Sequence, residues 1–301
     1  MNYNFLYIPF IKKMAVNSTK LLKWIPDRIY LKLLYRVRTG KKLNLNNPRR
    51  FNEKIQWLKL YDHNMDYIRM VDKYEAKAYV GEKCGKELII PTLGVWDSFD
   101  EIDFDLLPRQ FVLKCTHDSG GLVICKDKDT FDYVAAKKKI SKSLQKNYYY
   151  QNREWAYKFI KPRIIAEQYM EDLRHNELCD YKFMCADGDV KCCFTCTERF
   201  SNDGLKVTFF DNEWNVMPFE RHYPKSNKRI EKPENYEKMV QVAEELSKGL
   251  RFVRIDLYEI NGKVYFGEIT LYPGSGMEEF RPDEWDYKLG EWIDLRIEEA
   301  K

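Results

Sequence analysis

The chain has 301 residues, 44% of them hydrophobic and 33% charged, and a formal net charge of +4 at pH 7. This composition excludes an intrinsically disordered, collagen-like or coiled-coil protein, and the length predicts two domains or one large enzyme. The longest apolar run, Phe5–Ile11, is far shorter than the roughly 20 residues that a membrane-spanning helix needs. Two lysines and no small-residue cleavage site follow this run, so it does not resemble a secretory signal, and we expect a cytoplasmic protein.

The charge is distributed unevenly along the chain. Residues 1–50 contain twelve Lys and Arg residues against one acid, Asp27, whereas the remaining 251 residues carry a net charge of −7. A basic arm therefore precedes an acidic body. Such an arm can contact nucleic acid, an anionic membrane surface or an acidic polymer, or it can be the solvated face of ordinary helices.

Helices are expected in the first quarter of the chain. Between residues 15 and 62 the pattern predicts a basic helical stretch, a break at Thr39-Gly40 and a second helix over Asn52–Tyr61. A further helix is predicted over Asp66–Gly81, because apolar residues recur there at helical spacing and Gly81 lies near the end.

Short strands follow. Leu88–Pro91 begins a strand-like region that ends at an acidic, turn-rich segment over residues 97–108. Phe111–Cys115 is a buried-type strand by its β-branched and aromatic content, and a second apolar run covers Leu122–Cys125. A lysine-rich helix is predicted over Phe131–Leu144.

The carboxy-terminal half is predicted to consist mostly of strands. These are expected at Arg163–Tyr169, Tyr181–Ala186, Val190–Thr197, Lys206–Phe210, Phe252–Ile260 and Val264–Leu271. A helix is expected over Tyr236–Lys248, and Asn261-Gly262 is the strongest hairpin signal in the chain. Helices first, then a strand–loop–strand unit and an antiparallel half, indicate an α+β fold rather than a doubly wound sheet.

The eight cysteines show no pattern typical of disulfide bonds or of a zinc site. The C-x-x-C motif from Cys193 to Cys196 has no second C-x-x-C and no His-x-His partner. Small residues alternate around it as they do on the two faces of a strand. Because no secretory signal is recognised, we expect reduced thiols.

Lys114 is the first candidate for a functional side chain. Burying a lysine in an apolar strand is costly unless its charge meets an anion. Five residues later, Ser119-Gly120-Gly121 forms a turn with few side chains, whose amides can approach phosphates closely. The combination is a candidate triphosphate site, although it is neither a Walker A nor a Rossmann motif. The alternative is a surface lysine beside an ordinary hairpin.

Two acids, Asp256 and Glu268, lie in the apolar strands on either side of Asn261-Gly262 and need a cation or hydrogen-bond donors. With a two-residue turn and regular pairing, they point to opposite faces of the hairpin. With a three-residue loop or a β-bulge, they share a face and can hold Mg²⁺ together with substrate phosphates. The alternative is that both acids pair with basic neighbours, Arg254 and Lys263.

Taken in order, these motifs resemble those of a known family. Phe111–Lys114 with the glycine loop, Ile164–Tyr169 and the acid-bearing hairpin follow the order seen in ATP-grasp enzymes. More closely, residues 20–295 resemble the TupA-like (teichuronopeptide biosynthesis) ATP-grasp family of bacterial capsule and surface-polysaccharide gene clusters. The matching stretches include Phe51–Leu58, Asp72–Tyr74, Leu107-Pro108, Tyr265–Thr270 and Pro273–Gly276.

The resemblance implies an α+β ATP-grasp fold with a basic helical amino-terminal extension, and ATP and Mg²⁺ as cofactors. Residues 1–65 would form the basic helical region. Residues 66–165 would form the amino-terminal and central part with the phosphate-loop hairpin. Residues 166–301 would form the carboxy-terminal part with the hinge and the metal-binding hairpin.

The resemblance also implies roles for individual residues. Those binding ATP would be Lys73 and Lys114 at the phosphates, Ser119, Gly120 and Gly121 in the loop over them, Glu167, Gln168 and Tyr169 at the hinge beside the adenine, and Asp180 or Lys182 near the ribose and phosphates. The metal ligands would be Asp256, Glu268 and Thr270. Arg254 would act with Lys114 in catalysis by stabilising the phosphoryl group or an acyl-phosphate. Two residues depart from the family pattern: Thr270, where asparagine is common, and Asp118 in the loop.

The implied reaction is ATP-dependent ligation of a carboxylate and an amine through an acyl-phosphate. The family's genomic setting implies that the acid is a uronic acid of a capsular or cell-surface polysaccharide or of its precursor. Arg199, Arg221 and His222, in loops of the carboxy-terminal half, are candidates for binding this acidic sugar. The basic arm would contact an acidic polymer or the inner face of the membrane.

Other functions stay open at this point. Three D-x-D triplets, at Asp103–Asp105, Asp127–Asp129 and Asp187–Asp189, are compatible with a glycosyltransferase that holds a metal with a nucleotide sugar. An ATP-grasp sugar kinase would share the phosphoryl-transfer step. A nucleic-acid or polysaccharide binder would leave the strand lysine and the acid-bearing hairpin unexplained, so we expect no nucleic-acid partner.

Overall fold

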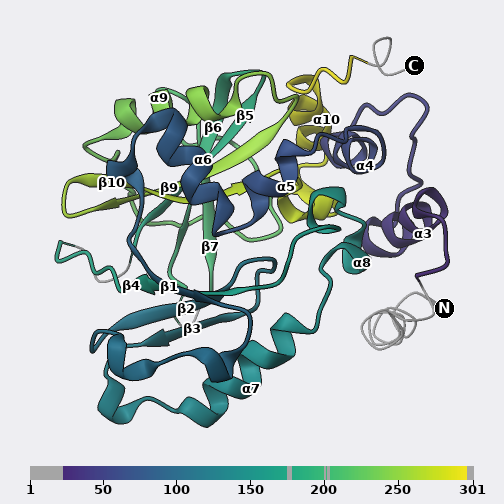
Figure 1. Ribbon diagram of the computed structural model, residues 1–301. Coiled ribbons are helices and arrows are strands. Elements are labelled where there is room, and N and C mark those ends of the chain that lie inside the picture. The colour runs from purple at the N-terminus through teal and green to yellow at the C-terminus, as the bar shows by residue number, and fades with distance from the viewer. Residues whose placement is uncertain (1–22, 175–177, 200, 202–203, 297–301) are drawn as a thin grey trace.

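The computed structural model describes residues 23–174, 178–199, 201 and 204–296. Two antiparallel sheets form its centre, and Figure 1 shows the smaller sheet below the larger one, with helices around both. The α-helices are α3 (Asp27–Thr39), α4 (Phe51–Tyr61), α5 (Asp66–Val71), α6 (Glu75–Cys84), α7 (Tyr133–Leu144), α8 (Tyr149–Asn152), α9 (Tyr236–Ser247) and α10 (Glu284–Glu291). The strands are β1 (Thr92–Trp96), β2 (Phe111–Cys115), β3 (Leu122–Cys125), β4 (Ile164–Gln168), β5 (Asp180–Ala186), β6 (Asp189–Thr197), β7 (Lys206–Phe210), β8 (Glu220–Arg221), β9 (Val253–Ile260), β10 (Lys263–Thr270) and β11 (Phe280–Arg281).

The smaller sheet has the order β1-β4-β2-β3. In β2, Phe111, Leu113 and Cys115 are buried in a core that α7 closes from one side. Because side chains alternate along a strand, Lys114 lies on the opposite face. The predicted bounds of β2 and β3 are both confirmed.

The larger sheet has the order β10-β9-β5-β6-β7. Helix α9 packs on it through buried residues three and four positions apart, including Met239, Val242 and Leu246. In β9, Ile255 and Leu257 are fully buried, and the alternating residues Arg254 and Asp256 lie on the opposite face. Each sheet therefore carries charged side chains on the face that its helices leave free.

Two predicted elements differ from the structure. The single helix expected over Asp66–Gly81 is wrong, because the chain leaves helical geometry at Asp72 and begins α6 at Glu75. The Asp72 carboxylate accepts the backbone N–H groups of Tyr74 and Glu75 at 2.8 and 3.1 Å, so it caps the second helix. The strand expected from Leu88 begins only after Pro91, because Lys86–Leu88 form a short 3₁₀ turn.

Helix α3 is fastened to the body by a buried arginine. It ends where predicted, with Gly40 in a left-handed conformation. The Arg153 guanidinium is enclosed by tyrosine rings, 4.2 Å from the ring centroid of Tyr30 and 5.4 Å from that of Tyr149, and its Nε lies 2.9 Å from Asp27 Oδ1. This contact joins α3 to α8.

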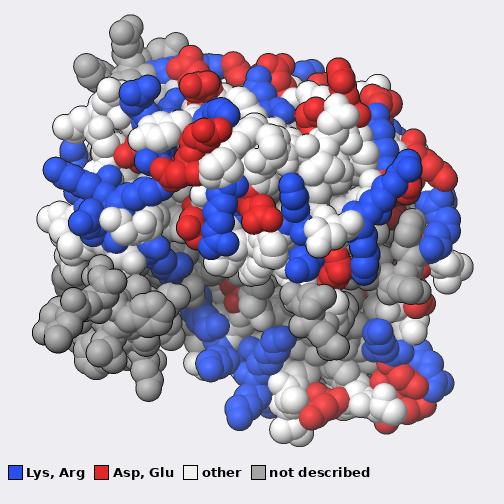
Figure 2. All heavy atoms as spheres, turned by 180° about the vertical axis from the view of Figure 1, so that it is seen from behind, with Lys and Arg blue, Asp and Glu red and all other residues white. Residues whose placement is uncertain are grey.

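Seen from behind in Figure 2, Lys and Arg side chains gather at the edge where α3 lies and again over α7. The basic residues of these helices are Arg28, Lys32, Arg36 and Arg38 in α3, and Lys137, Lys138, Lys139 and Lys142 in α7. The first 22 residues of the predicted basic arm lie outside the described part. Across the described part, no helix combines the length and the apolar character needed to cross a bilayer.

Candidate active site

Lys114 meets a buried anion on the smaller sheet. Its Nζ lies 2.5 Å from one carboxylate oxygen of Glu167, and Lys77 Nζ lies 2.5 Å from the other. Burial by itself would raise the pKa of Glu167, but the two ammonium groups hold it below its ordinary value. Burial likewise opposes the charge on Lys114, yet Glu167 raises the pKa of Lys114, so the lysine is held charged on the free face of the sheet.

Lys73 reaches the loop between β2 and β3 from the break between α5 and α6. Its backbone N–H donates to Thr116 O at 3.0 Å, and its Nζ donates to Asp118 O at 2.6 Å. The non-helical turn is therefore what brings this lysine beside the predicted phosphate loop. A continuous helix over Asp66–Gly81 would not give Lys73 these contacts.

Asp118, the unexpected acid in the loop, is turned into the protein. Its Oδ1 accepts the Gly121 N–H at 2.9 Å, and its Oδ2 accepts the Ser143 hydroxyl on α7. Gly121 has no room for a side chain, because a Cβ would lie 2.5 Å from Cys115 Sγ. Asp118 thus stabilises the loop from within, while Ser119 and Gly120 at its tip are exposed.

The β9–β10 hairpin combines a tight turn with a bulge. Ile260 pairs with Lys263, so Asn261-Gly262 is a two-residue turn. The register then shifts between Phe266 and Glu268, which leaves Gly267 unpaired and sets Glu268 opposite Asp256. Of the alternatives open at the sequence level, the β-bulge is the one that the structure contains. The bulge brings both acids to one face.

Arg254 lies between these two acids. Its Nε and Nη2 contact Asp256 at 2.6 and 2.7 Å, and the same Nη2 lies 2.7 Å from Glu268 Oε1. Lys182 Nζ also binds Asp256 and lies 2.8 Å from Asp180 Oδ2. Burial would raise the pKa of Glu268, but Arg254, Lys73 and Lys182 lower it to about 2. Basic groups of the larger sheet and of the break between α5 and α6 therefore act together on this carboxylate.

The donor set at this point fits a small hard cation. Asp256 and Glu268 present carboxylate oxygens to one spot, and the Thr270 hydroxyl lies 3.2 Å from Glu268 Oε1. Mg²⁺ is commonly bound by one or two carboxylates together with substrate phosphates, so two acids suffice. No cluster of three or more His, Cys, Asp or Glu suited to a metal occurs among the residues that the structure describes.

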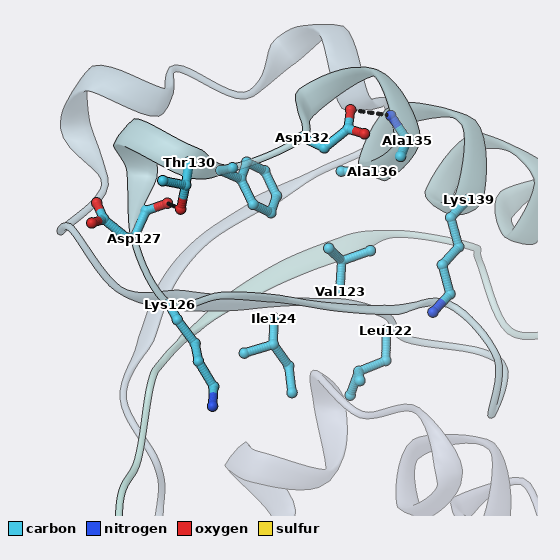
Figure 3. Close-up of a pocket in the computed structure, with 11 residues that line it drawn as sticks. Leu122, Val123, Ile124, Lys126, Asp127, Thr130, Asp132, Ala135, Ala136 and Lys139 are labelled. Atoms are coloured by element: carbon cyan, nitrogen blue, oxygen red, sulfur yellow. Dashed lines mark hydrogen bonds between the residues drawn. The ribbon is translucent and has the colours of Figure 1, made fainter.

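An apolar surface adjoins Lys114 on the same face of the smaller sheet. Leu122 pairs with Lys114 and Ile124 with Val112, and both β3 side chains are exposed. Figure 3 shows Leu122 and Ile124 pointing away from α7, whereas Val123 points toward it. A cavity of about 550 Å³ follows β3 along its outer edge, but it includes neither the lysines nor the acids described above.

Some of the remaining predicted residues lie beside the site, and others are exposed away from its buried charges. Arg199 Nη2 contacts Asp180 at 2.6 Å, at the end of the site that also holds Lys182. Gln168 is exposed at the end of β4, and Tyr169 follows it, half-buried. Arg221 is buried on the side of Arg254, whereas its neighbour His222 is exposed.

Three tyrosines and one lysine in the site carried no recognisable sequence signal. Tyr148 OH lies 3.4 Å from Ser119 Oγ, and its ring centroid is 5.0 Å from that of Tyr157. Burial and the nearby acids Glu154 and Glu268 raise the pKa of Tyr157. Tyr258 lies within electrostatic range of Lys114. Like Lys77, these residues belong to types that are ordinary on helices and strands.

A comparison with family models decides the relationship. The model of the TupA-like ATPgrasp family matches residues 53–294. This chain belongs to the TupA-like ATP-grasp family. The resemblance seen in the motifs is therefore confirmed, and the α+β ATP-grasp fold with it. A comparison with curated protein sequences gives no match.

Solved structures similar to this TupA-like protein are remote in sequence. D-alanine–D-alanine ligase from Helicobacter pylori is 15% identical, with 81% of this chain and 69% of that chain covered and a TM-score of 0.41. The enzyme from Bacillus anthracis complexed with ATP is 16% identical, covering 77% and 64%, with a TM-score of 0.42. The ATP-grasp ligase PsnB, complexed with a phosphomimetic precursor variant, Mg and ADP, is 12% identical, covering 78% and 60%, with a TM-score of 0.42. This chain thus spans about two thirds of the length of these enzymes or less.

Proposed function

We propose that the protein is an ATP-dependent carboxylate–amine ligase that forms an amide on a uronic acid of a capsular or cell-surface polysaccharide or of its precursor. Membership of the TupA-like ATP-grasp family supports the use of ATP. The observation that carries the proposal is the bulge at Gly267, which sets Asp256 opposite Glu268 with Arg254 between them. Such a group of charges is suited to a phosphoryl group and its metal ion.

Residues of the smaller sheet would hold the nucleotide. Lys73 and Lys114 would contact the phosphates, and the exposed amides at Ser119 and Gly120 would approach them closely. Leu122 and Ile124 offer an apolar surface to the base. Until a phosphate is present, Glu167 holds Lys114 in position.

Residues of the larger sheet would act on the reacting groups. Asp256, Glu268 and Thr270 would hold Mg²⁺, which supplies positive charge to the phosphate oxygens when bound. Arg254 would contact the carboxylate or acyl-phosphate with its planar fork. In the reaction, a carboxylate oxygen displaces ADP from the phosphoryl group. The amine then forms the C–N bond, and phosphate leaves with that oxygen.

The D-x-D triplets lend no support to a glycosyltransferase, because each serves a local turn. Asp103 and Asp127 accept backbone N–H groups two residues onward, at 3.0 and 3.1 Å. Asp187-Gly188 is the turn between β5 and β6. A sugar kinase would also transfer a phosphoryl group from ATP, so only the products distinguish it from a ligase.

Oxygen tracing distinguishes the two. Galacturonate or glucuronate with a heavy-oxygen-labelled carboxyl group, free or linked to UDP, is incubated with the protein, Mg-ATP and a mixture of amines. A ligase releases inorganic phosphate that carries one heavy oxygen, and the product mass equals acid plus amine minus water. Phosphate that stays on the sugar would show a kinase, and UDP release without ATP turnover would show a glycosyltransferase.

A further inference from the structure

Arg221 in β8 is a second buried guanidinium beside Arg254. Arg221 is only 6% exposed, and its Cζ lies 5.0 Å from the ring centroid of Phe194. Arg254 Cζ lies 6.0 Å from the same ring centroid. In the sheet register Phe194 pairs with Lys182, and Arg254 pairs with Met184, whose sulfur accepts from Arg221 Nη1 at 3.8 Å. Both guanidinium groups therefore lie near one aromatic ring on the face that carries the candidate active site.

The donors of Arg221 exceed the acceptors around it. A guanidinium has five N–H groups, yet within the described residues its one carboxylate partner is Glu278, whose Oε2 lies 2.9 Å from Nε. Nη2 makes no hydrogen bond to any described residue. It is also not fully enclosed by the protein, so a ligand can reach it. Burial lowers the pKa of Arg221 and nearby Arg254 lowers it further, whereas Glu278 opposes them. The unused Nη2 donors of Arg221 can therefore bind one more acceptor.

We propose that Arg221 and Arg254 together form the subsite that binds the carboxylate of the acid substrate. The inference rests on the proposed ligase function and deepens it, because it names the groups that recognise an acid. The forked N–H groups of an arginine match the two oxygens of a carboxylate. A neutral sugar has a single uncharged hydroxyl oxygen in that place, so it would satisfy fewer of the buried donors, and the subsite therefore selects acids.

The competing explanation is that Arg221 only anchors the chain around Glu278. Glu278 follows the turn Pro273–Gly276, and a Cβ on Gly274 would lie 2.3 Å from its carboxylate, so the acid packs against that turn. The two explanations predict opposite results for Glu278→Gln. If Arg221 is an anchor, Glu278→Gln and Arg221→Met both break the same Arg221–Glu278 contact, and both lose acid binding to the same extent. If Arg221 is a subsite, removing Glu278 frees the guanidinium and leaves acid binding as tight or tighter.

The test measures binding by calorimetry rather than turnover. The titrants are UDP-galacturonate and UDP-glucuronate, free galacturonate and glucuronate, and the neutral sugars UDP-galactose, UDP-glucose, galactose and glucose. All titrations contain Mg²⁺ and a non-hydrolysable ATP analogue. The proteins are wild type, Arg221→Met, Arg221→Lys, Glu278→Gln and the control Arg281→Met. Arg281 is an exposed residue of β11, the strand that pairs with β8.

We expect wild type and Arg281→Met to bind at least one acid about tenfold or more tightly than its neutral counterpart. Arg221→Met should lose this preference, Arg221→Lys should keep part of it, and Glu278→Gln should keep all of it. An unchanged preference in Arg221→Met, an equal loss in Glu278→Gln, or no preference for any acid in wild type would each overturn the inference. The ATP analogue is titrated separately into every protein. Failure of the analogue to bind wild type would count against the proposed function. Normal nucleotide binding by a wild type that shows no preference for acids would count against the subsite alone.

Discussion

At the scale of single residues, Glu167 is a buried acid whose carboxylate is shared by two half-buried lysines. Glu167→Gln would leave both ammonium groups without a full counter-charge, so we expect the free energy of unfolding to fall by about 3 kcal/mol. Urea unfolding followed by tryptophan fluorescence measures this. Lys161→Met, which breaks an exposed pair with Asp97, is the control and should cost less than about 1 kcal/mol. Equal costs would contradict the account.

The low pKa of Glu268 predicts a pH dependence of stability. Its folded pKa of about 2 lies below the ordinary value of 4.5, because Arg254, Lys73 and Lys182 outweigh the opposing effect of burial. The ionised form therefore stabilises the folded protein above the ordinary pKa, and this contribution is lost as the pH falls from about 4.5 toward 2. Melting temperatures across that range should fall less steeply for Glu268→Gln than for wild type. Parallel curves would show that Glu268 is not stabilised by these groups.

The sequence revealed those site residues whose charge is costly to bury. Lys114, Asp256 and Glu268 stand out because each interrupts an apolar strand. Lys77 lies on a helix where a lysine is unremarkable, and Tyr157 belongs to an aromatic stretch where any ring could be core. Their roles depend on which distant segments fold against them, and periodicity contains no such information.

At the scale of elements, the bulge at Gly267 is the feature on which the paired acids depend. A Cβ there would lie 2.9 Å from the Tyr258 ring and 3.0 Å from Asp256 O. We expect Gly267→Ala to lower the free energy of unfolding by about 1–3 kcal/mol and to weaken binding of Mg-nucleotide. Chemical denaturation and calorimetry measure the two effects.

The matched control for this substitution is Gly81→Ala within α6. The nearest atom to an added Cβ there is 3.5 Å away, so the change should be neutral or should stabilise the protein by up to about 1 kcal/mol. If Gly267→Ala left Mg-nucleotide affinity unchanged, the bulge would have no role in setting the metal site.

The break between α5 and α6 makes a second element-scale prediction. Asp72 caps α6 and also contacts Arg163 Nη2 at 3.2 Å. Asp72→Ala should cost about 1 kcal/mol as a lost cap and should weaken nucleotide binding, because Lys73 is no longer directed to the phosphate loop. Asp66→Ala, an exposed position at the start of α5, is the control. Nucleotide affinity equal in both variants would contradict this role of the break.

The β9–β10 hairpin and the break between α5 and α6 show what the sequence could and could not predict. Asn261-Gly262 indicated the hairpin because its turn chemistry is local. The bulge and the helix break were not local. Glu268 reaches the face of Asp256 through packing between strands, and Asp72 is held partly by Arg163, which lies far along the chain. The sequence left the bulge as one of several alternatives and missed the helix break, and both features position the site.

At the scale of the whole molecule, α3 presents an apolar and basic face to the outside. Trp24, just before the helix, is 89% exposed, and Ile29 and Leu33 are 52% and 59% exposed, one turn apart. Basic residues of the same helix flank them, and Figure 2 shows the basic edge. We expect the full chain to bind vesicles that contain phosphatidylglycerol and to be released by salt.

Vesicle flotation tests this surface. The triple change Trp24→Ser, Ile29→Ser and Leu33→Ser should abolish flotation with phosphatidylglycerol, and vesicles of pure phosphatidylcholine should not bind. Leu106→Ser, at an exposed position in the smaller-sheet region, should change nothing. Flotation of the triple variant equal to that of wild type would mean that α3 is not the membrane contact.

The central claim is that this protein couples ATP cleavage to joining an acid and an amine, and nucleotide release tests it most directly. Purified protein is incubated with Mg-ATP, UDP-galacturonate or UDP-glucuronate and a mixture of amines, and ADP, phosphate and UDP are quantified. Asp256→Asn serves as the inactive comparison. We expect ADP and phosphate in equal amounts, and only when acid and amine are both present. With Asp256→Asn, release should fall by a factor on the order of 10², as for the loss of one electrostatic catalytic group. UDP release without ATP turnover, or ADP release that ignores the acid, would contradict this claim.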